Sequence, residues 1–186
     1  MLPPTYIAGL FDGEGSVSLI YTVRRRRRND EIPILGFKFV VLLGNTHRGI
    51  LDSLQCQYSG YIHPNWHGAP TNRKPMWTWR LTTFETQYRF LVDIEPHCII
   101  KEEAVRLGLR YLSTAKRQGL RTSPDDWVTR VEVYRALTVV NQRGTTPKKK
   151  RETPVDPPEG WRPSRRFTPT ELHEPMNRMR TCRFHQ

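Results

Sequence analysis

The sequence lacks any long apolar run. Among its 186 residues, no apolar stretch approaches the roughly 20 residues that a membrane-spanning helix needs. The N-terminus also lacks the charged segment followed by a clean apolar one that a secretory signal shows. We therefore expect a soluble protein with no membrane partner. We expect it inside the cell, in the cytoplasm or nucleoid or in an organelle that has its own genome.

Cysteine is scarce, with Cys56, Cys98 and Cys182 as the three examples. They are odd in number, far apart and never in a CxxC pair, so we expect neither a disulfide framework nor a structural zinc site. Near the C-terminus, Cys182 and His185 with His173 upstream do not complete a tetrahedral metal site.

Acidic residues are outnumbered, with 18 Asp and Glu against 30 Lys and Arg, which gives a net charge of +12. The resulting positive field favours polyanions, either nucleic acid or an acidic membrane surface. Nucleic acid is the partner that we expect.

The composition changes near Gly144. Residues 144–186 hold seven of the 15 prolines and ten Lys/Arg against five Asp/Glu, with few clustered aliphatic residues. This composition predicts a flexible basic tail. Residues 1–143 keep 20 Lys/Arg against 13 Asp/Glu and are predicted to form one folded domain that is itself basic.

Hydrophobic spacing predicts an α+β domain with the order αββαββα and extra C-terminal helices. Residues 4–12 fit a short helix that begins at Pro4 and is stopped by Gly13. Two strands follow, at residues 16–23 and 34–43, joined by an arginine-rich hairpin tip. The later elements are a helix in 46–57, strands in 60–66 and 75–82, and helices in 84–94, 99–119 and 126–142.

Alternating residues assign the two faces of the predicted antiparallel sheet. The set expected to face the core is Val17, Leu19, Tyr21, Val23, Phe37, Phe39, Val41, Leu43, Trp77, Trp79 and Leu81. Helices should cover this face, which leaves the opposite face open to solvent or a ligand.

Residues 7–15, IAGLFDGEG, are an unusual cluster of small and acidic residues. They resemble the LAGLIDADG motif of the homing endonuclease and maturase family, whose unit has the same αββαββα order. The resemblance covers roughly residues 4–115, and the chain has one copy of the motif. It implies a sheet that forms a DNA-binding saddle, with the helices on its other face.

Within the motif, Gly13 and Gly15 are expected to let the chain leave a helix and enter a strand within a few residues. Glu14 is then held beside carbonyl groups at the negative end of the helix, where a hard cation such as Mg²⁺ is favoured. We predict that Glu14 and the backbone carbonyl of Gly13 bind a divalent metal. The alternative for Glu14 is a solvated turn carboxylate. Asp12 is expected to support the helix end or the metal site.

Ala8 and Gly9 carry little side-chain bulk, so another backbone can approach the helix closely, and a second copy of the chain is the natural partner. Cutting two DNA strands requires two acidic positions, whereas one motif supplies one. The resemblance therefore implies a homodimer with these helices paired at its two-fold axis, and a roughly palindromic target.

The open face of the sheet is expected to lie in the DNA major groove, where each base pair presents a different pattern of donors and acceptors. By strand parity the DNA-facing residues are Ser18, Ile20, Thr22, Arg24, Arg26, Lys38, His63, Asn65, Thr78 and Arg80. The run Arg24–Arg28 also fits a solvated loop or a nuclear-import-like patch. Contacts to phosphates or bases are favoured because arginine binds both bidentately.

The resemblance adds Lys101, where family members carry a basic residue near the scissile phosphate, and Asn45, at the polar position that closes the second strand. By spacing alone each would be an unremarkable surface residue, whereas the resemblance places both with Glu14 in the expected catalytic set. The implied activity is that of an intron-encoded, sequence-specific, Mg²⁺-dependent DNA endonuclease that makes a staggered double-strand break.

Two other functions fit the same scaffold and charge. One is a maturase, an RNA-binding splicing cofactor that stabilises intron RNA. The other is a DNA-binding regulator that has lost cleavage. The joint presence of Glu14, Lys101 and Asn45 favours the nuclease, because RNA binding alone does not need an acid at that turn.

Overall fold

The computed structural model describes residues 1–24, 34–64, 75–115 and 123–142. The elements follow the predicted αββαββα order, with a 3₁₀ turn and two further helices after it. They are α1 (Pro4–Glu14), β1 (Gly15–Arg24), β2 (Ile34–Asn45), α2 (Arg48–Tyr58), β3 (Tyr61–Pro64), β4 (Trp77–Leu81), α3 (Phe84–Ile94), η1 (Glu95–His97), α4 (Glu102–Ala115) and α5 (Pro124–Val140). The arrangement confirms the predicted α+β class. The predicted tail lies outside the described residues.

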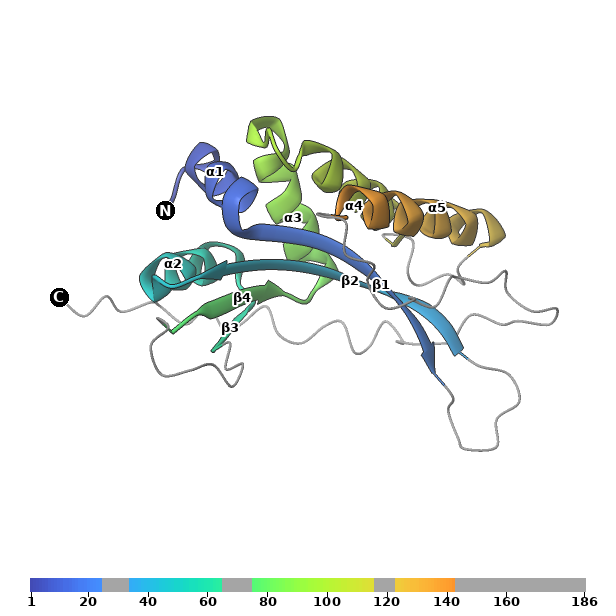
Figure 1. Cartoon of the computed structure of the whole chain (residues 1–186), viewed down its shortest axis with the longest axis horizontal. Coiled ribbons are helices and arrows are strands. Elements are labelled where there is room, and N and C mark those ends of the chain that lie inside the picture. The colour runs from blue at the N-terminus through green and yellow to red at the C-terminus, as the bar shows by residue number, and fades with distance from the viewer. Residues whose placement is uncertain (25–33, 65–74, 116–122, 143–186) are drawn as a thin grey trace.

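The four strands form one antiparallel sheet in the order β1-β2-β4-β3. β1 and β2 pair from Gly15 with Leu43 to Arg24 with Ile34, which makes a long two-stranded ribbon. Helices α1, α3, α4 and α5 lie on one side of this ribbon (Figure 1). The opposite side of the sheet is the open face.

Most of the predicted inward residues belong to the core. Val17, Val41, Leu43 and Trp79 are fully buried among apolar residues of the helices. Val23 was also predicted to face the core, but it is 44% exposed. It lies near the end of the edge strand β1, and its cross-strand partner Leu35 is the residue that packs with Trp127 and Val131 of α5 there.

Helix α5 covers the end of the ribbon that is distant from α1. Its Trp127 and Val131 pack with Leu35, and the Trp127 and Phe37 rings lie with their centroids 5.2 Å apart. Tyr21 joins the same group through Phe37, at 5.4 Å between centroids. This aromatic cluster fixes α5 on the sheet.

Several element bounds differ from the prediction. Helix α1 continues to Glu14, α2 begins at Arg48, and α4 begins at Glu102 rather than at residue 99. Residues 99–101 are not helical because side-chain contacts from α1 hold their backbone, as described below. Within the described ranges, no helix is both long and apolar enough to cross a membrane.

Candidate active site

Helix α1 passes directly into strand β1, and Glu14 is its exposed last residue. Gly15 has an extended backbone, with φ −81° and ψ 166°, which any residue can adopt. It must be glycine for a different reason, because an added Cβ would lie 2.1 Å from the buried Phe11 ring. Gly13 lies inside the helix, where a Cβ would meet nothing within 4 Å. The prediction that Gly13 stops the helix is therefore wrong.

Asp12 joins α1 to the segment that precedes α4. Its carboxylate accepts hydrogen bonds from the backbone N–H groups of Ile99 (2.8 Å) and Lys101 (2.9 Å). Burial opposes ionisation of Asp12, but these backbone donors, that of Ile100 and the Lys101 charge together hold its pKa below the ordinary value of 3.8. The ionised carboxylate thus supports both the end of α1 and the start of α4.

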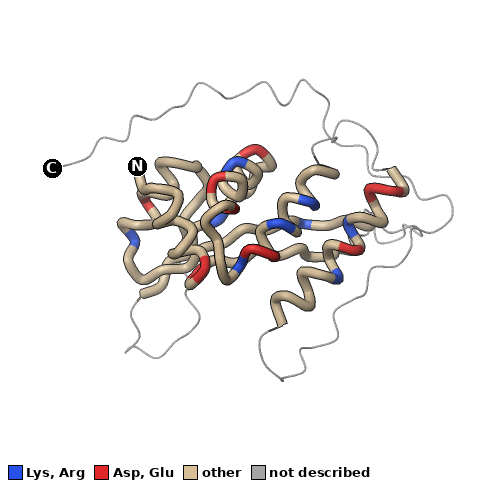
Figure 2. The backbone as a smooth tube through the Cα atoms, turned by 90° about the horizontal axis from the view of Figure 1, so that it is seen from above, with Lys and Arg blue, Asp and Glu red and all other residues tan. Residues whose placement is uncertain are grey.

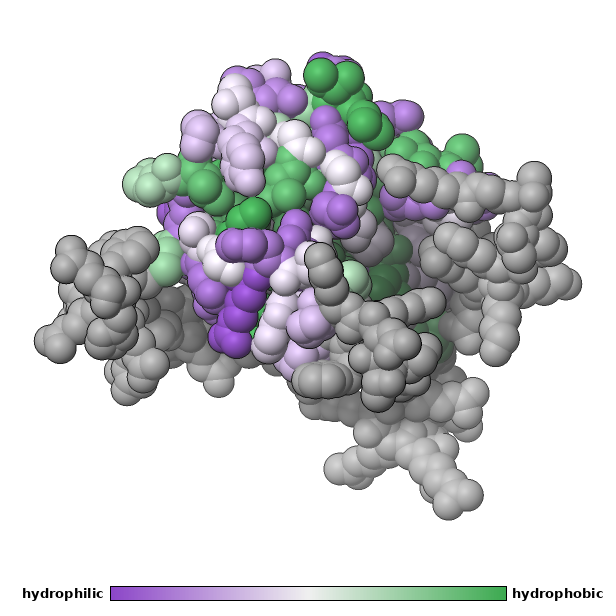
Figure 3. Space-filling model, turned by 60° about the vertical axis from the view of Figure 1, so that its left-hand side comes forward, coloured by the Kyte–Doolittle hydropathy of each residue, from purple (hydrophilic) through white to green (hydrophobic). Residues whose placement is uncertain are grey.

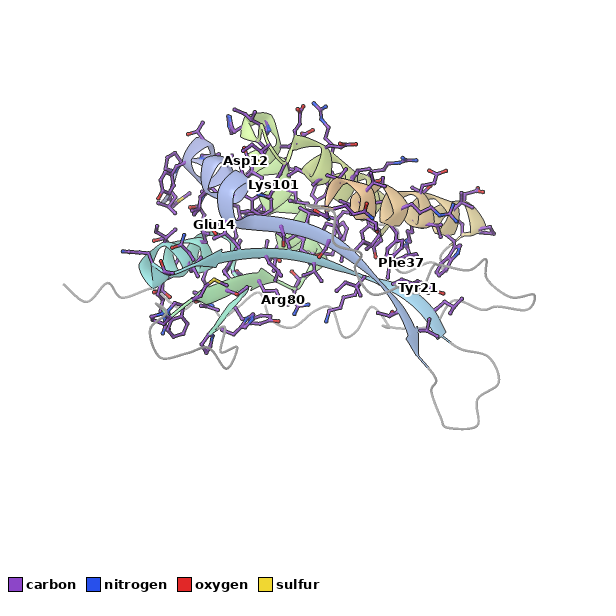
Figure 4. The ribbon with its side chains drawn as sticks, in the orientation of Figure 1. Asp12, Glu14, Tyr21, Phe37, Arg80 and Lys101 are labelled. Atoms are coloured by element: carbon purple, nitrogen blue, oxygen red, sulfur yellow. The ribbon has the colours of Figure 1, made fainter. Side chains whose placement is uncertain are left out.

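Lys101 completes this connection from the opposite direction. Its Nζ donates to the carbonyl oxygen of Phe11 at 2.9 Å and to that of Asp12. A cation is favoured there because the last carbonyls of a helix carry partial negative charge. The carbonyl of Gly13 and the carboxylate of Glu14 are the next oxygen groups along the chain. Figure 4 shows Asp12, Lys101 and Glu14 around the final turn of α1.

Asn45 reaches the same end of the sheet through strand pairing. Because Gly15 pairs with Leu43, the end of β2 runs past the junction that carries Glu14. The Asn45 side-chain oxygen accepts from the backbone N–H of His47 at 2.7 Å, which turns the chain toward α2. The structure thus brings Glu14, Lys101 and Asn45, the predicted catalytic residues, to one end of the sheet.

Arg48 is a neighbour of this site to which the sequence assigns no role. Its guanidinium lies over the Trp77 ring at 4.5 Å from the centroid and pairs with Asp52 at 3.5 Å. The i,i+4 spacing of Arg48 and Asp52 is a visible sequence signal. The contact with Trp77 is not, because it depends on the pairing of β2 with β4.

The oxygen groups of the site suit a hard divalent cation, which prefers carboxylate and carbonyl ligands. Within the described part of the chain, no group of three or more His, Cys, Asp or Glu side chains could hold a metal by itself. Glu14 and the Gly13 carbonyl therefore form an incomplete set within one chain.

The outer face of α1 differs from the predicted dimer surface at one residue. Ala8 is fully buried in the core beside Ile7 and Phe11, so its side chain cannot meet a partner. Gly9 and Gly13 lie on the exposed side, where a Cβ at either would meet nothing within 4 Å. The prediction for Ala8 is wrong because this side of the helix packs on the chain's own sheet and helices.

Charge separates the sheet from the helices. The four strands contain no Asp or Glu, whereas both signs are interspersed along the helices (Figure 2). Basic residues of the helices pair with acids there, as Arg106 does with Glu102 and Arg110 with Glu132, both at 2.7 Å. The described sheet is thus a cationic surface without acidic side chains.

Most of the predicted DNA-facing residues that the structure describes lie on the open face. Ile20 and Lys38 are exposed, and the half-buried members are Ser18, Thr22, His63 and Arg80. Thr78 is a correction, because it has the expected parity but is only 8% exposed. Arg26, Asn65 and the side chain of Arg24 lie outside the described residues.

No protein-family model matches the sequence, and no curated protein matches it either. Solved structures of homing endonucleases do match. I-CvuI in complex with its target is 14% identical, with a TM-score of 0.58 over 80% of this chain and 85% of that chain. The archaeal intron-encoded I-Vdi141I complexed with DNA is 14% identical, with a TM-score of 0.57 over 78% and 88%. The LAGLIDADG meganuclease I-AabMI is 15% identical, with a TM-score of 0.54 over 74% and 45%.

These matches define an α+β unit in which a motif helix leads into an open antiparallel sheet. The chain has the LAGLIDADG homing endonuclease fold, as residues 7–15 indicate. At such identities the likeness establishes the fold alone.

Proposed function

We propose that the protein is a divalent-metal-dependent endonuclease that cuts both strands of a specific DNA site and leaves staggered ends. The observation that carries this proposal is the position of Glu14, an exposed carboxylate at the junction of α1 with a sheet that has no acidic residue. The matched structures I-CvuI and I-Vdi141I are complexes with DNA. A cationic sheet would bind the phosphates and bases beside the acid.

Glu14 and the Gly13 carbonyl would hold the metal, for which we propose Mg²⁺. When bound, such an ion would stabilise the charge that develops on the phosphate and favour a nucleophilic water. Lys101 fixes the final turn of α1 through the carbonyls of Phe11 and Asp12, and so positions Glu14. We propose that its ammonium also lies near the scissile phosphate. The side-chain NH₂ of Asn45 would orient a water, since its oxygen already accepts from His47.

A homodimer would complete the site, because one chain supplies one Glu14. The match covers 85% of I-CvuI but 45% of I-AabMI, and the motif occurs once in residues 1–186. Gly9 and Gly13 leave one side of α1 open, and Tyr6 on this helix is 47% exposed. The adjacent Ile99 and Ile100 are 83% and 70% exposed, although Asp12 fixes their backbone.

Figure 3 shows this side of the molecule, where apolar surface lies at the top and centre among polar residues. Two neighbouring exposed isoleucines on a fixed segment are suited to an interface rather than to water, because each would gain about 1.5–3 kcal/mol on burial. We therefore place the partner against α1 and residues 99–100.

The nuclease is tested by incubating the purified chain with DNA that carries its site, with Mg²⁺ or with EDTA. The DNA is either the joined exons, where an intron surrounds the reading frame, or a selected member of a random library. We expect double-strand cuts that require the metal and fall by about two orders of magnitude or more in Glu14→Gln, since several kcal/mol of transition-state stabilisation is lost. Glu85→Gln, an exposed acid at the start of α3, is the matched control.

Cutting that persists in EDTA or in Glu14→Gln would contradict the assigned role of Glu14. Tight binding to intron RNA without cleavage of any DNA would favour the maturase. Specific DNA binding without cleavage would indicate a regulator.

The dimer is tested by sedimentation equilibrium. We expect the wild-type mass to be twice that of one chain, and Ile99→Lys with Ile100→Lys to weaken association at least about tenfold, because two buried apolar side chains become charged. The control is Val139→Lys, since Val139 is 68% exposed on α5. A monomeric wild-type protein, or a double variant that associates normally, would contradict this interface.

A further inference from the structure

The open face of the β1–β2 ribbon has few side chains that can reach a ligand. Gly36 has none, and Val40 is 3% exposed although it lies on this face. The hydroxyl of Thr22 donates to the carbonyl of Gly36 across the ribbon at 3.1 Å. These three positions therefore offer little that could distinguish bases.

Ile20 and Lys38 are the exceptions. Of the outward residues in the described stretches Ser16–Thr22 and Gly36–Gly44, these two are exposed, and Ile20 is 47% exposed. They are also direct partners across the strand pair. Directly opposed residues have Cβ atoms about 4.5–5.5 Å apart, so the two side chains rise together from one spot on the sheet.

The side chains of Ile20 and Lys38 suit different chemical groups on the bases. An isoleucine cannot form a hydrogen bond, and its match in the major groove is the methyl group of thymine. A lysine is a donor, and its match is the O6 and N7 acceptor pair of guanine. No single base pair offers both a thymine methyl and the O6 and N7 acceptors of guanine, so Ile20 on a thymine and Lys38 on a guanine would address different base pairs. A base-pair rise of about 3.4 Å is compatible with their spacing.

We propose that Ile20 and Lys38 form one specificity subsite that reads two neighbouring base pairs, an inference that rests on the proposed DNA-binding function. Ile20 packs on the methyl of a thymine, and Lys38 donates to a guanine in the next pair. The rest of this stretch contributes shape rather than base recognition.

The test begins with selection of bound sites from random DNA by the full chain. The selected site is then made with deoxyuridine in place of single thymines, which removes only the methyl group. In EDTA, where we expect no cutting, one substitution in each half-site should weaken binding about fourfold per contact, equivalent to one buried methyl. In Ile20→Ser the same substitution should have no effect. Lys38→Ala should lose the preference for guanine at the adjacent pair, while both variants keep the wild-type melting temperature.

The outcomes separate this inference from the proposed function. If no sequence is selected at all, both are overturned. If a clear site is selected but deoxyuridine at every thymine leaves wild-type binding unchanged, or Ile20→Ser remains sensitive to it, the subsite alone is overturned. An unaltered base preference in Lys38→Ala would also overturn it.

Discussion

The two ends of the β1–β2 ribbon are held in different ways. At the end near α1, Ile7 and Phe11 are fully buried in the core, and polar contacts add to this packing: Asp12 accepts hydrogen bonds from the backbone of Ile99 and Lys101, and Lys101 donates to the carbonyls at the end of the helix. At the far end, α5 is held by the rings of Trp127, Phe37 and Tyr21. Both ends bury apolar residues, and at the near end directional bonds also fix the turn that carries Glu14.

In the proposed nuclease this difference would suit the two ends to different tasks. Hydrogen bonds depend on distance and angle, so they fix the direction in which Glu14 leaves α1. Aromatic packing tolerates small shifts, and it stabilises in proportion to the area removed from water. The near end should therefore govern the geometry of cleavage, and the far end the overall stability.

Trp127→Ala should have the largest effect on stability. Trp127 is 3% exposed, so its removal leaves a cavity against Leu35 and Phe37 and should lower the free energy of unfolding by about 3–5 kcal/mol. The measurement is urea denaturation with hydrogen exchange. Amide protection should fall more at the far end of β1 and β2 than around α1.

Val128→Ala is the matched control, since the adjacent Val128 is 55% exposed and should change stability by less than about 0.5 kcal/mol. Equal loss of protection at both ends in Trp127→Ala would show that the two ends are not held independently.

Gly15→Ala should have the next largest effect, at the near end. The new Cβ would lie 2.1 Å from the Phe11 ring, so the ring or the α1–β1 junction must shift, at about 1–3 kcal/mol. Because the shift falls beside Glu14, cleavage should fall by more than the stability loss alone explains. The measurement is denaturation together with the cutting rate under conditions where the variant is folded.

Gly44→Ala is the control, because a Cβ there meets only Met76 and Trp77, at 3.7 Å and 3.8 Å, which are ordinary van der Waals distances. A Gly15→Ala protein as stable and active as the wild type would refute the role given to the Phe11 contact.

The element order and the two faces of the sheet were predictable because both rest on local periodicity. The exceptions have nonlocal causes. Neighbouring helix positions point about 100° apart, so the sequence could not decide whether Ala8 or Gly9 faced the core. The start of α4 at Glu102 depends on the contacts of Asp12. The position of the Lys101 side chain depends on carbonyl groups of a helix about 90 residues earlier. A glycine was expected at the junction of the helix and the strand. The reason for Gly15 is the close approach of the Phe11 ring, which the sequence does not show.

Asp12→Asn should change stability no more than Gly15→Ala does, and its effect should depend on pH. The folded protein lowers the pKa of Asp12 below 3.8, so the ionised carboxylate stabilises the fold above that pH, and this contribution is lost as the pH falls through the folded pKa. Asparagine keeps one acceptor oxygen and leaves the other backbone donor unsatisfied, so at pH 7 the variant should be about 1–3 kcal/mol less stable. Urea unfolding at pH 7 and at pH 3 measures the difference.

That difference between wild type and Asp12→Asn should narrow below pH 4, because the wild type loses the interaction that the variant never had. Glu132→Gln, which breaks an exposed ion pair with Arg110, should differ from the wild type by about 0–1 kcal/mol. If the Asp12→Asn difference is the same at both pH values, the negative charge of Asp12 is not what holds residues 99–101. The near end would then rest on packing, as the far end does.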